Sequence, residues 1–142
     1  MSQPQYRLIR SIFETLTDYG RYFAMAQVYV PDITAGDKRI LLIEGEPVPY
    51  ALAHIPTGDD NRGNMVAGAV AKGQAMSARD FEICERVGPA LRDAGVLFAG
   101  IDVIGDYLTE VNVTSPTGIR ELDGQFDLNI AGLMFDAIES KI

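Results

Sequence analysis

The sequence has little of what several classes of protein depend on. It contains one cysteine, Cys84, and one histidine, His54, in 142 residues. A single thiol excludes an internal disulfide, and these two residues supply too few ligands for a structural zinc site. Lysine and arginine number 12 against 20 acidic residues, so the net charge is −8. We therefore expect neither a nucleic-acid partner, which needs a basic face, nor a polybasic contact with a membrane.

Long apolar runs are also missing. No stretch is long and apolar enough to span a bilayer, and Met1–Arg10 lacks the apolar core of a signal peptide. These absences lead us to expect a cytoplasmic protein. The composition, with 47% apolar and 23% charged residues, is typical of a globular domain. A length of 142 residues fits one domain with its own core.

Three segments have the apolar period of an α-helix. The first covers residues 8–16. The second begins at Ser77 and Asp80, which are spaced as a capping box, and continues to Arg92. The third follows Asn129, a residue suited to cap a helix N-terminus.

Five other segments are rich in β-branched and aromatic residues and predict strands. They are Tyr22–Val30, Arg39–Ile43, Val48–Ile55, Val96–Ile104 and Tyr107–Val113. Turn residues at Gly45 and Gly105 indicate hairpins, so we expect an α+β fold, a largely antiparallel sheet with helices packed on one face. Pro56–Met76, rich in glycine and small residues, predicts a long functional loop.

Polar side chains interrupt two of the apolar strands. Glu110 and Asn112 are two residues apart, so they share a sheet face, and the turn at Gly105 brings Asp102 across from them. Three oxygen-bearing side chains on one face suit Mg²⁺, which prefers a few hard ligands and retains room for phosphate or water. The alternative is a hydrated sheet face on which charged residues alternate outward. Spacing alone leaves both interpretations open.

Two arginines and one turn are candidates for anion binding. Arg39 opens an apolar strand and could hold a phosphate or carboxylate with two parallel hydrogen bonds. Arg62 lies in the predicted loop and would suit a lid. The turn Thr114-Ser115-Pro116-Thr117 offers hydroxyls and backbone N–H groups. Each of these three features could instead be an ordinary solvent-exposed part of the surface. His54 and Cys84 are interpreted as structural residues.

Several motifs stand in a fixed order along the chain. They are Met25-Ala26-Gln27-Val28-Tyr29-Val30-Pro31, Gly36-Asp37-Lys38-Arg39, Gly45-Glu46-Pro47-Val48-Pro49-Tyr50, Arg62-Gly63-Asn64, Gly100-Ile101-Asp102-Val103-Ile104-Gly105-Asp106 and Thr109-Glu110-Val111-Asn112-Val113-Thr114-Ser115-Pro116-Thr117. Together they resemble bacterial glutathione synthetase, of the ATP-grasp superfamily. The resemblance implies that residues 1–142 form the C-terminal ATP-grasp subdomain, without the N-terminal substrate domain and the lysine-bearing ATP subdomain.

The resemblance implies an ATP-dependent carbon–nitrogen ligase that joins γ-glutamylcysteine to glycine through an acyl phosphate. Asp102, Glu110 and Asn112 would hold Mg²⁺ or Mn²⁺, with Asn112 also next to the nucleotide. Arg39 and Arg62 would be the catalytic residues. The matching positions imply ATP contacts at Gln27, Tyr29, Val30 and Asp37, and substrate contacts at Asn64, Thr114, Ser115 and Thr117.

Two departures from the family pattern affect the expected site. This chain has His54 where the family has an arginine, and Gly68-Ala69-Val70-Ala71 replaces a run rich in glycine and arginine. We expect residues 1–142 on their own to make no glutathione. The alternative is a fragment or paralogue that binds a nucleotide or a partner without catalysis, that partner being the missing N-terminal part or a second copy in a weak homodimer.

Overall fold

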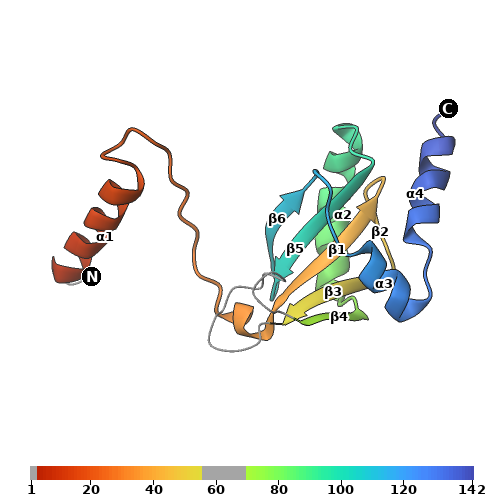
Figure 1. The fold of residues 1–142 in the computed structure, drawn as a ribbon, viewed down its shortest axis with the longest axis horizontal. Helices are drawn as coiled ribbons and strands as arrows, with labels where there is room; N and C mark the ends of the chain where they lie inside the picture. Colours follow the sequence, from red (N-terminus) through yellow and green to blue (C-terminus); the bar gives the residue numbers. More distant parts are fainter. Residues whose placement is uncertain (1–2, 56–69) are drawn as a thin grey trace.

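The structure is a computed structural model that describes residues 3–55 and 70–142 (Figure 1). The first part contains α1 (Gln3–Leu16), the 3-10 helix η1 (Pro31–Ala35), β1 (Asp37–Ile43), β2 (Glu46–Pro47) and β3 (Tyr50–Ile55). The second contains β4 (Val70–Ala75), α2 (Ala78–Asp93), β5 (Phe98–Ile104), β6 (Tyr107–Asn112), α3 (Ile119–Phe126) and α4 (Ile130–Glu139).

The described strands form one antiparallel sheet in the order β4-β3-β1-β5-β6, with β2 paired to β1. The α+β class and the antiparallel sheet are confirmed. The strand β1 lies in the middle, so its apolar residues Ile40, Leu41 and Leu42 are fully buried. A central strand that is covered on both faces has a continuous apolar run rather than alternation.

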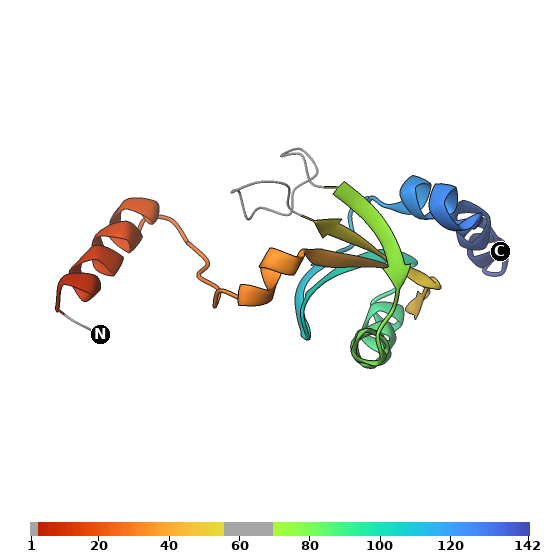
Figure 2. The same ribbon diagram turned by 90° about the horizontal axis from the view of Figure 1, so that it is seen from below.

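Helices cover both faces of the sheet (Figure 2). On one face, Ile83, Cys84 and Leu91 of α2 pack against the core. On the other, Leu122 of α3 and Ile130 of α4 pack against a second cluster. The sequence predicts helices on one face of the sheet and does not predict α3, whereas the structure has a second helical layer on the other face.

The predicted turns and helix caps are present. Glu44 and Gly45 have φ values of 52° and 78°, the left-handed pair that two-residue hairpin turns require. Ser77 Oγ accepts a hydrogen bond from the Asp80 N–H at 3.2 Å, and an Asp80 carboxylate oxygen accepts one from the Ser77 N–H at 2.8 Å. These two bonds complete the capping box at the start of α2.

Two expectations about secondary structure are wrong. Residues 23–30, predicted as most of a strand, have no regular secondary structure. Their β-forming residues need a partner strand, and no described strand pairs with them. The C-terminal part of the predicted loop Pro56–Met76 forms β4, whose six residues all pair with β3, and residues 56–69 of that prediction lie outside the described residues. The composition of β4 does not favour a strand, so the exposed edge of β3 decides its conformation.

The first helix lies apart from the sheet and is joined to it by the extended segment before η1 (Figure 1). Its apolar side chains are exposed, including Tyr6 at 67%, Leu8 at 64% and Leu16 at 62%. In the described residues, no helix has the length and hydropathy needed to cross a membrane.

Candidate functional site

The site is built around Arg39 on the central strand. Register places Arg39 of β1 directly opposite Asp102 of β5. Arg39 Nε donates to Asp102 Oδ1 at 2.8 Å, and Nη2 donates to Oδ2 at 2.7 Å. The side chains are 14% and 9% exposed. Hydrogen bonding to Asp102 raises the pKa of Arg39 above its ordinary value, so the guanidinium stays charged.

The turn after β6 folds back over this pair. Arg39 Nη1 donates to Thr117 Oγ1 at 2.9 Å. Pro116 is buried against Gly100 of β5, where an added Cβ would lie 2.7 Å from the Pro116 ring. The absence of a side chain at Gly100 therefore lets the turn approach the sheet. As a result, one guanidinium joins the central strand, a carboxylate and a hydroxyl that are far apart in the sequence.

The strand β6 adds two polar side chains to the same face. Glu110 lies opposite Asp102, and Asn112 lies opposite Gly100. Residues directly opposite in an antiparallel pair, and residues two apart in a strand, point to one face. The three residues predicted to hold a metal ion, Asp102, Glu110 and Asn112, therefore lie on the face that carries Arg39.

Two of these three side chains already have partners. Both carboxylate oxygens of Asp102 accept bonds from Arg39, and Asn112 Oδ1 accepts one from the Thr114 N–H at 2.9 Å. In residues 3–55 and 70–142, no group of three or more His, Cys, Asp or Glu side chains has a metal-binding arrangement. The predicted set has two carboxylates and one amide. All its donors are oxygens, which fits Mg²⁺, but the ion would need further ligands from phosphate or water.

The other predicted residues are distributed unevenly. Asp37 begins β1 and points to the same face as Arg39, two residues away. Gln27, Tyr29 and Val30 belong to the segment before η1, where Tyr29 is 63% exposed. The structure does not bring these three into contact with Arg39. The predicted residues of the loop, Arg62 and Asn64, lie outside the described residues. Thr114 and Ser115 are exposed in the turn that carries Thr117.

The sequence indicates a structural role for His54, and the structure gives it a polar partner. His54 lies opposite Asp37, and its Nδ1 is 3.4 Å from Asp37 Oδ2. The signal that could have identified it is alternation along β3. Side chains two apart in a strand share a face, so Tyr50, Leu52 and His54 point to the same side of the sheet. Tyr50 and Leu52 belong to the apolar cluster under α3. A histidine that follows two apolar residues on one face indicates that the apolar cluster ends there.

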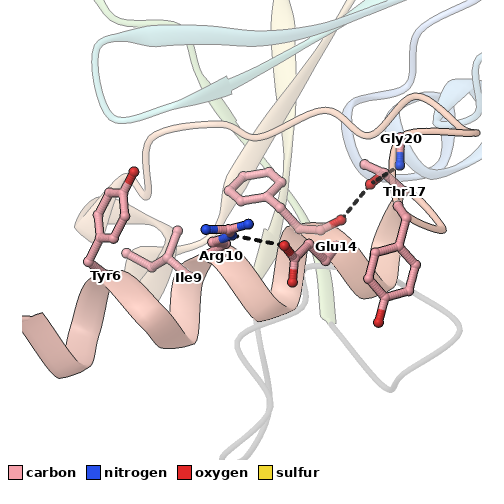
Figure 3. A pocket seen from close by; sticks show the side chains of 8 residues that line it. Tyr6, Ile9, Arg10, Glu14, Thr17 and Gly20 are labelled. Atoms are coloured by element: carbon pink, nitrogen blue, oxygen red, sulfur yellow. Dashed lines mark hydrogen bonds and ion pairs between the residues drawn. The ribbon is translucent and has the colours of Figure 1, made fainter.

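A surface concavity of about 500 Å³ lies elsewhere, along α1 (Figure 3). It is lined by side chains of the helix and of the turn that follows it, including Tyr6 and Phe13. Arg10 and Glu14 form an ion pair there at 2.8 Å. None of the polar residues of the sheet face lines this concavity, so we do not assign the site to it.

Comparison with known proteins decides the family. Residues 2–127 match the family described as prokaryotic glutathione synthetase, ATP-grasp domain. This chain belongs to that family. It is 64% identical over 129 residues to a glutathione synthetase of Xanthomonas campestris, a match that covers 91% of this chain and 41% of the relative. A glutathione synthetase of Shewanella oneidensis is 55% identical over 131 residues, which cover 92% of this chain and 42% of the relative.

The chain thus spans about two-fifths of the length of these relatives. The fold is also found in a solved structure of the ATP-grasp ligase PsnB complexed with a minimal precursor. It has a TM-score of 0.51 at 21% identity and covers 74% of this chain and 33% of PsnB. The stretch that matches the prokaryotic glutathione synthetase family includes every site residue named above.

Proposed function

We propose that this chain supplies the metal- and peptide-binding half of a glutathione synthetase-type ligase. The reaction would use ATP to convert the C-terminal carboxylate of γ-glutamylcysteine to an acyl phosphate, which the amine of glycine then attacks. The observation that carries the proposal is the connection of Arg39 to both Asp102 and Thr117 on the polar part of the sheet face.

The chemistry required of such a site is mostly positioning and charge neutralisation. Arg39 is a permanent cation held rigidly by Asp102, so it is suited to steady the transferring phosphoryl group. The hydroxyls of Thr114, Ser115 and Thr117 would hold a peptide carboxylate. Arg62 and Asn64 would contribute from the predicted lid.

The residues proposed for magnesium or manganese are Asp102, Glu110 and Asn112. A bound divalent ion would supply charge neutralisation for the phosphates. The proposed contacts of ATP are Gln27, Tyr29, Val30, Asp37 and Asn112. The assignment of the metal ligands is supported by the shared face of Asp102, Glu110 and Asn112. Their side chains offer only oxygen atoms, which suit a divalent ion of this kind.

A chimeric enzyme tests this function. The 129-residue stretch of this chain that is 64% identical to the Xanthomonas campestris glutathione synthetase would replace the matching segment of that enzyme. We expect glutathione formation from ATP, γ-glutamylcysteine and glycine. Arg39→Lys keeps the charge but loses the bidentate grip and should lower kcat by about 10²-fold or more, as loss of one transition-state donor does. A chimera that folds and binds ATP but makes no glutathione would contradict the proposal.

Arg79→Lys is the matched control. Arg79 on α2 also makes two contacts, to the Asp106 carbonyl and to Glu82. Neither Asp102 nor Thr117, the partners of Arg39, is among them. The same substitution should leave kcat of the chimera unchanged. Residues 1–142 alone, assayed beside the chimera, should form no product, because we propose that they provide one half of the phosphate site. Product from the chain alone would show that this second expectation is wrong.

The exposed apolar side chains favour a second candidate, a partner-binding module. Besides those of α1, Met25 is 83% exposed and Tyr29 is 63% exposed. Clustered exposed apolar residues often mark an interface. A weak homodimer that strengthens with salt, measured by sedimentation at two salt concentrations, would support this candidate. A dimer that dissociates as salt rises would contradict it, because attraction between opposite charges, and not burial of apolar side chains, would then hold the two copies together.

A further inference from the structure

The turn between β6 and α3 rests on the sheet through Pro116. This residue is buried, whereas Thr114, Ser115 and Thr117 around it are exposed. A Cβ on Gly100 of β5 would lie 2.7 Å from the Pro116 Cβ, a separation that real Cβ atoms essentially never show. The proline ring therefore occupies the space that any other residue at position 100 would fill with its own side chain.

The strand side of this contact is the less able to move. Gly100 lies between two paired strands, opposite Leu41 of β1 and Asn112 of β6, and Leu41 is fully buried. Because packed interiors yield little, a side chain at position 100 would displace the turn rather than the strand. The 2.7 Å separation is short of the 3.4 Å at which ordinary contact begins, so the turn would retreat by about 0.7 Å.

Both ends of the turn are fixed, so Pro116 decides the position of the residues between them. At the start, Asn112 Oδ1 accepts a hydrogen bond from the Thr114 N–H at 2.9 Å. At the end, Gly118 is buried with a φ of 121°, and a Cβ there would lie 3.3 Å from a leucine side chain of β3. Thr117 directly follows the proline, so the depth of the ring sets the place of the Thr117 hydroxyl.

Thr117 connects the turn to the proposed site. Arginine has only N–H donors, so Thr117 Oγ1 is the acceptor in its 2.9 Å bond with Arg39 Nη1. The hydroxyl keeps its own hydrogen to donate, and a carboxylate can only accept. Thr117 can therefore donate to a peptide carboxylate while it accepts from the guanidinium. Two hydrogen bonds in series polarise each other, which makes the hydroxyl a stronger donor.

A retreat of the turn would break this connection. Movement by about 0.7 Å along the bond would lengthen the 2.9 Å distance to about 3.6 Å, which is no longer a hydrogen bond. Arg39 would stay in place, because Asp102 holds its Nε and Nη2 atoms. The peptide and the phosphoryl group would then lose their common support, and a misplacement of about 1 Å can cost about 10²-fold in rate.

We propose that Gly100 and Pro116 are positioning residues, whose contact sets the separation between the peptide carboxylate at Thr117 and the phosphoryl group at Arg39. This inference rests on the proposed function, since that function assigns the peptide to the turn. Gly100 and Pro116 act through Thr117 and not on the substrate directly. Their substitution should therefore affect the peptide substrate and the chemical step but not the nucleotide.

The kinetic test compares two glycine-to-alanine changes in the chimera. Gly100→Ala should raise the KM for γ-glutamylcysteine about tenfold and lower kcat about tenfold or more, with the KM for ATP unchanged. Gly88→Ala is the matched control, because it creates a collision of the same kind in α2, against the turn at Gly45. It should lower the urea midpoint of unfolding without changing either KM. Equal rises in both KM values for Gly100→Ala, or kinetics equal to those of the parent chimera, would overturn the inference.

Rescue by a second change separates positioning from a simple loss of stability. Pro116→Gly removes the Cβ with which the Gly100→Ala methyl group collides. The double variant should therefore bring the KM for γ-glutamylcysteine back toward the parent value by about threefold or more relative to Gly100→Ala alone. Pro116→Gly combined with Gly88→Ala should show additive effects, because these two positions share no contact. A Gly100→Ala, Pro116→Gly variant that is no better than Gly100→Ala would contradict the proposal.

Equilibrium binding distinguishes failure of this inference from failure of the proposed function. Calorimetry gives the Kd of γ-glutamylcysteine for each folded chimera, whether or not that chimera makes glutathione. If the parent chimera makes no glutathione but binds the peptide, and Gly100→Ala alone weakens binding, the inference stands and the proposed reaction is wrong. If the parent makes glutathione and Gly100→Ala changes neither Kd nor kinetics, only the inference is wrong. A parent chimera that neither makes glutathione nor binds the peptide overturns both, as does an inactive parent whose Kd is unchanged by Gly100→Ala.

Discussion

Arg39 and Asp102 lie directly opposite each other on β1 and β5, and the guanidinium of Arg39 holds both carboxylate oxygens of Asp102. Because Asp102 is also proposed to hold a metal, its carboxylate has two roles to fill. In this structure its oxygens stabilise the arginine. Glu110 lies opposite Asp102 on the other side and is the exposed carboxylate of the set.

Removing one member of this pair should be costly. Asp102→Ala leaves the half-buried Arg39 without its carboxylate, and breaking a buried pair costs about 3–5 kcal/mol. We expect the free energy of unfolding in urea to fall by that amount. Replacing both residues, as Arg39→Met with Asp102→Leu, should recover most of the loss, because no uncompensated charge remains. A double variant as unstable as Asp102→Ala would contradict this explanation.

Glu110 should contribute to metal binding more than to the fold. It is exposed, so Glu110→Gln should change the free energy of unfolding by less than about 0.5 kcal/mol. The same change removes a charged ligand and should weaken binding of Mn²⁺ in the chimera by about tenfold or more. Electron paramagnetic resonance of free Mn²⁺ measures this. Equal Mn²⁺ affinity in parent and Glu110→Gln chimeras would exclude Glu110 as a ligand.

The Asp80 carboxylate should make stability depend on acidity. Burial acts to raise the pKa of Asp80, but hydrogen bonds from Lys38 and Ser77 outweigh it and lower the pKa below the ordinary value of 3.8. A pKa that is lower in the folded state gives stability that is present above the unfolded value and is lost as the pH falls through the folded one. Urea unfolding of the parent chain should therefore lose stability below about pH 4.

Asp80→Asn provides the comparison for this effect. The amide cannot titrate, so the difference in free energy of unfolding between parent and variant should shrink as the pH falls below about 4. At neutral pH the variant should be the less stable of the two, because Lys38 loses a charged partner at 2.6 Å. A difference that stays constant between pH 7 and pH 3 would show that Asp80 has the same pKa folded and unfolded.

Two helical glycines should respond in opposite directions to the same change. Gly88 in α2 packs against the turn at Gly45, where an added Cβ would collide with the Gly45 carbonyl oxygen. Gly124 in α3 has nothing within 4 Å of the Cβ position. Gly88→Ala should destabilise the protein by about 1–3 kcal/mol. Gly124→Ala should stabilise it by about 0.5–1 kcal/mol. Thermal unfolding of both variants measures the contrast, and a stabilised Gly88→Ala would refute the close approach.

Cys84 should be unreactive in the folded protein. It is 2% exposed, and burial raises the pKa of its thiol to about 11. Because the thiolate is the reactive form, a thiol reagent at pH 8 should react only as fast as the chain unfolds. The rate should rise with urea in parallel with unfolding measured by circular dichroism. Rapid reaction of one equivalent without denaturant would show that the α2 face is open.

The sequence by itself determined the features that depend on neighbours along the chain. The glycines of the hairpin turns supply left-handed backbone, and the Ser77–Asp80 spacing supplies its own cap. The spacing of Glu110 and Asn112 put them on one face for the same reason. These interactions span a few residues, so local pattern is enough to predict them, and the order of motifs was enough to indicate the family.

Only the tertiary structure decided the rest. Tyr22–Val30 has strand-forming residues but no described partner strand, whereas β4 has weak propensity and forms on the edge of β3. The pairing of Arg39 with Asp102 joins residues 63 positions apart, and that of Asp37 with His54 joins residues 17 apart. Both depend on the placement of β1 between β3 and β5. Strand order is set by which apolar faces pack together across the whole chain, and no local pattern encodes it.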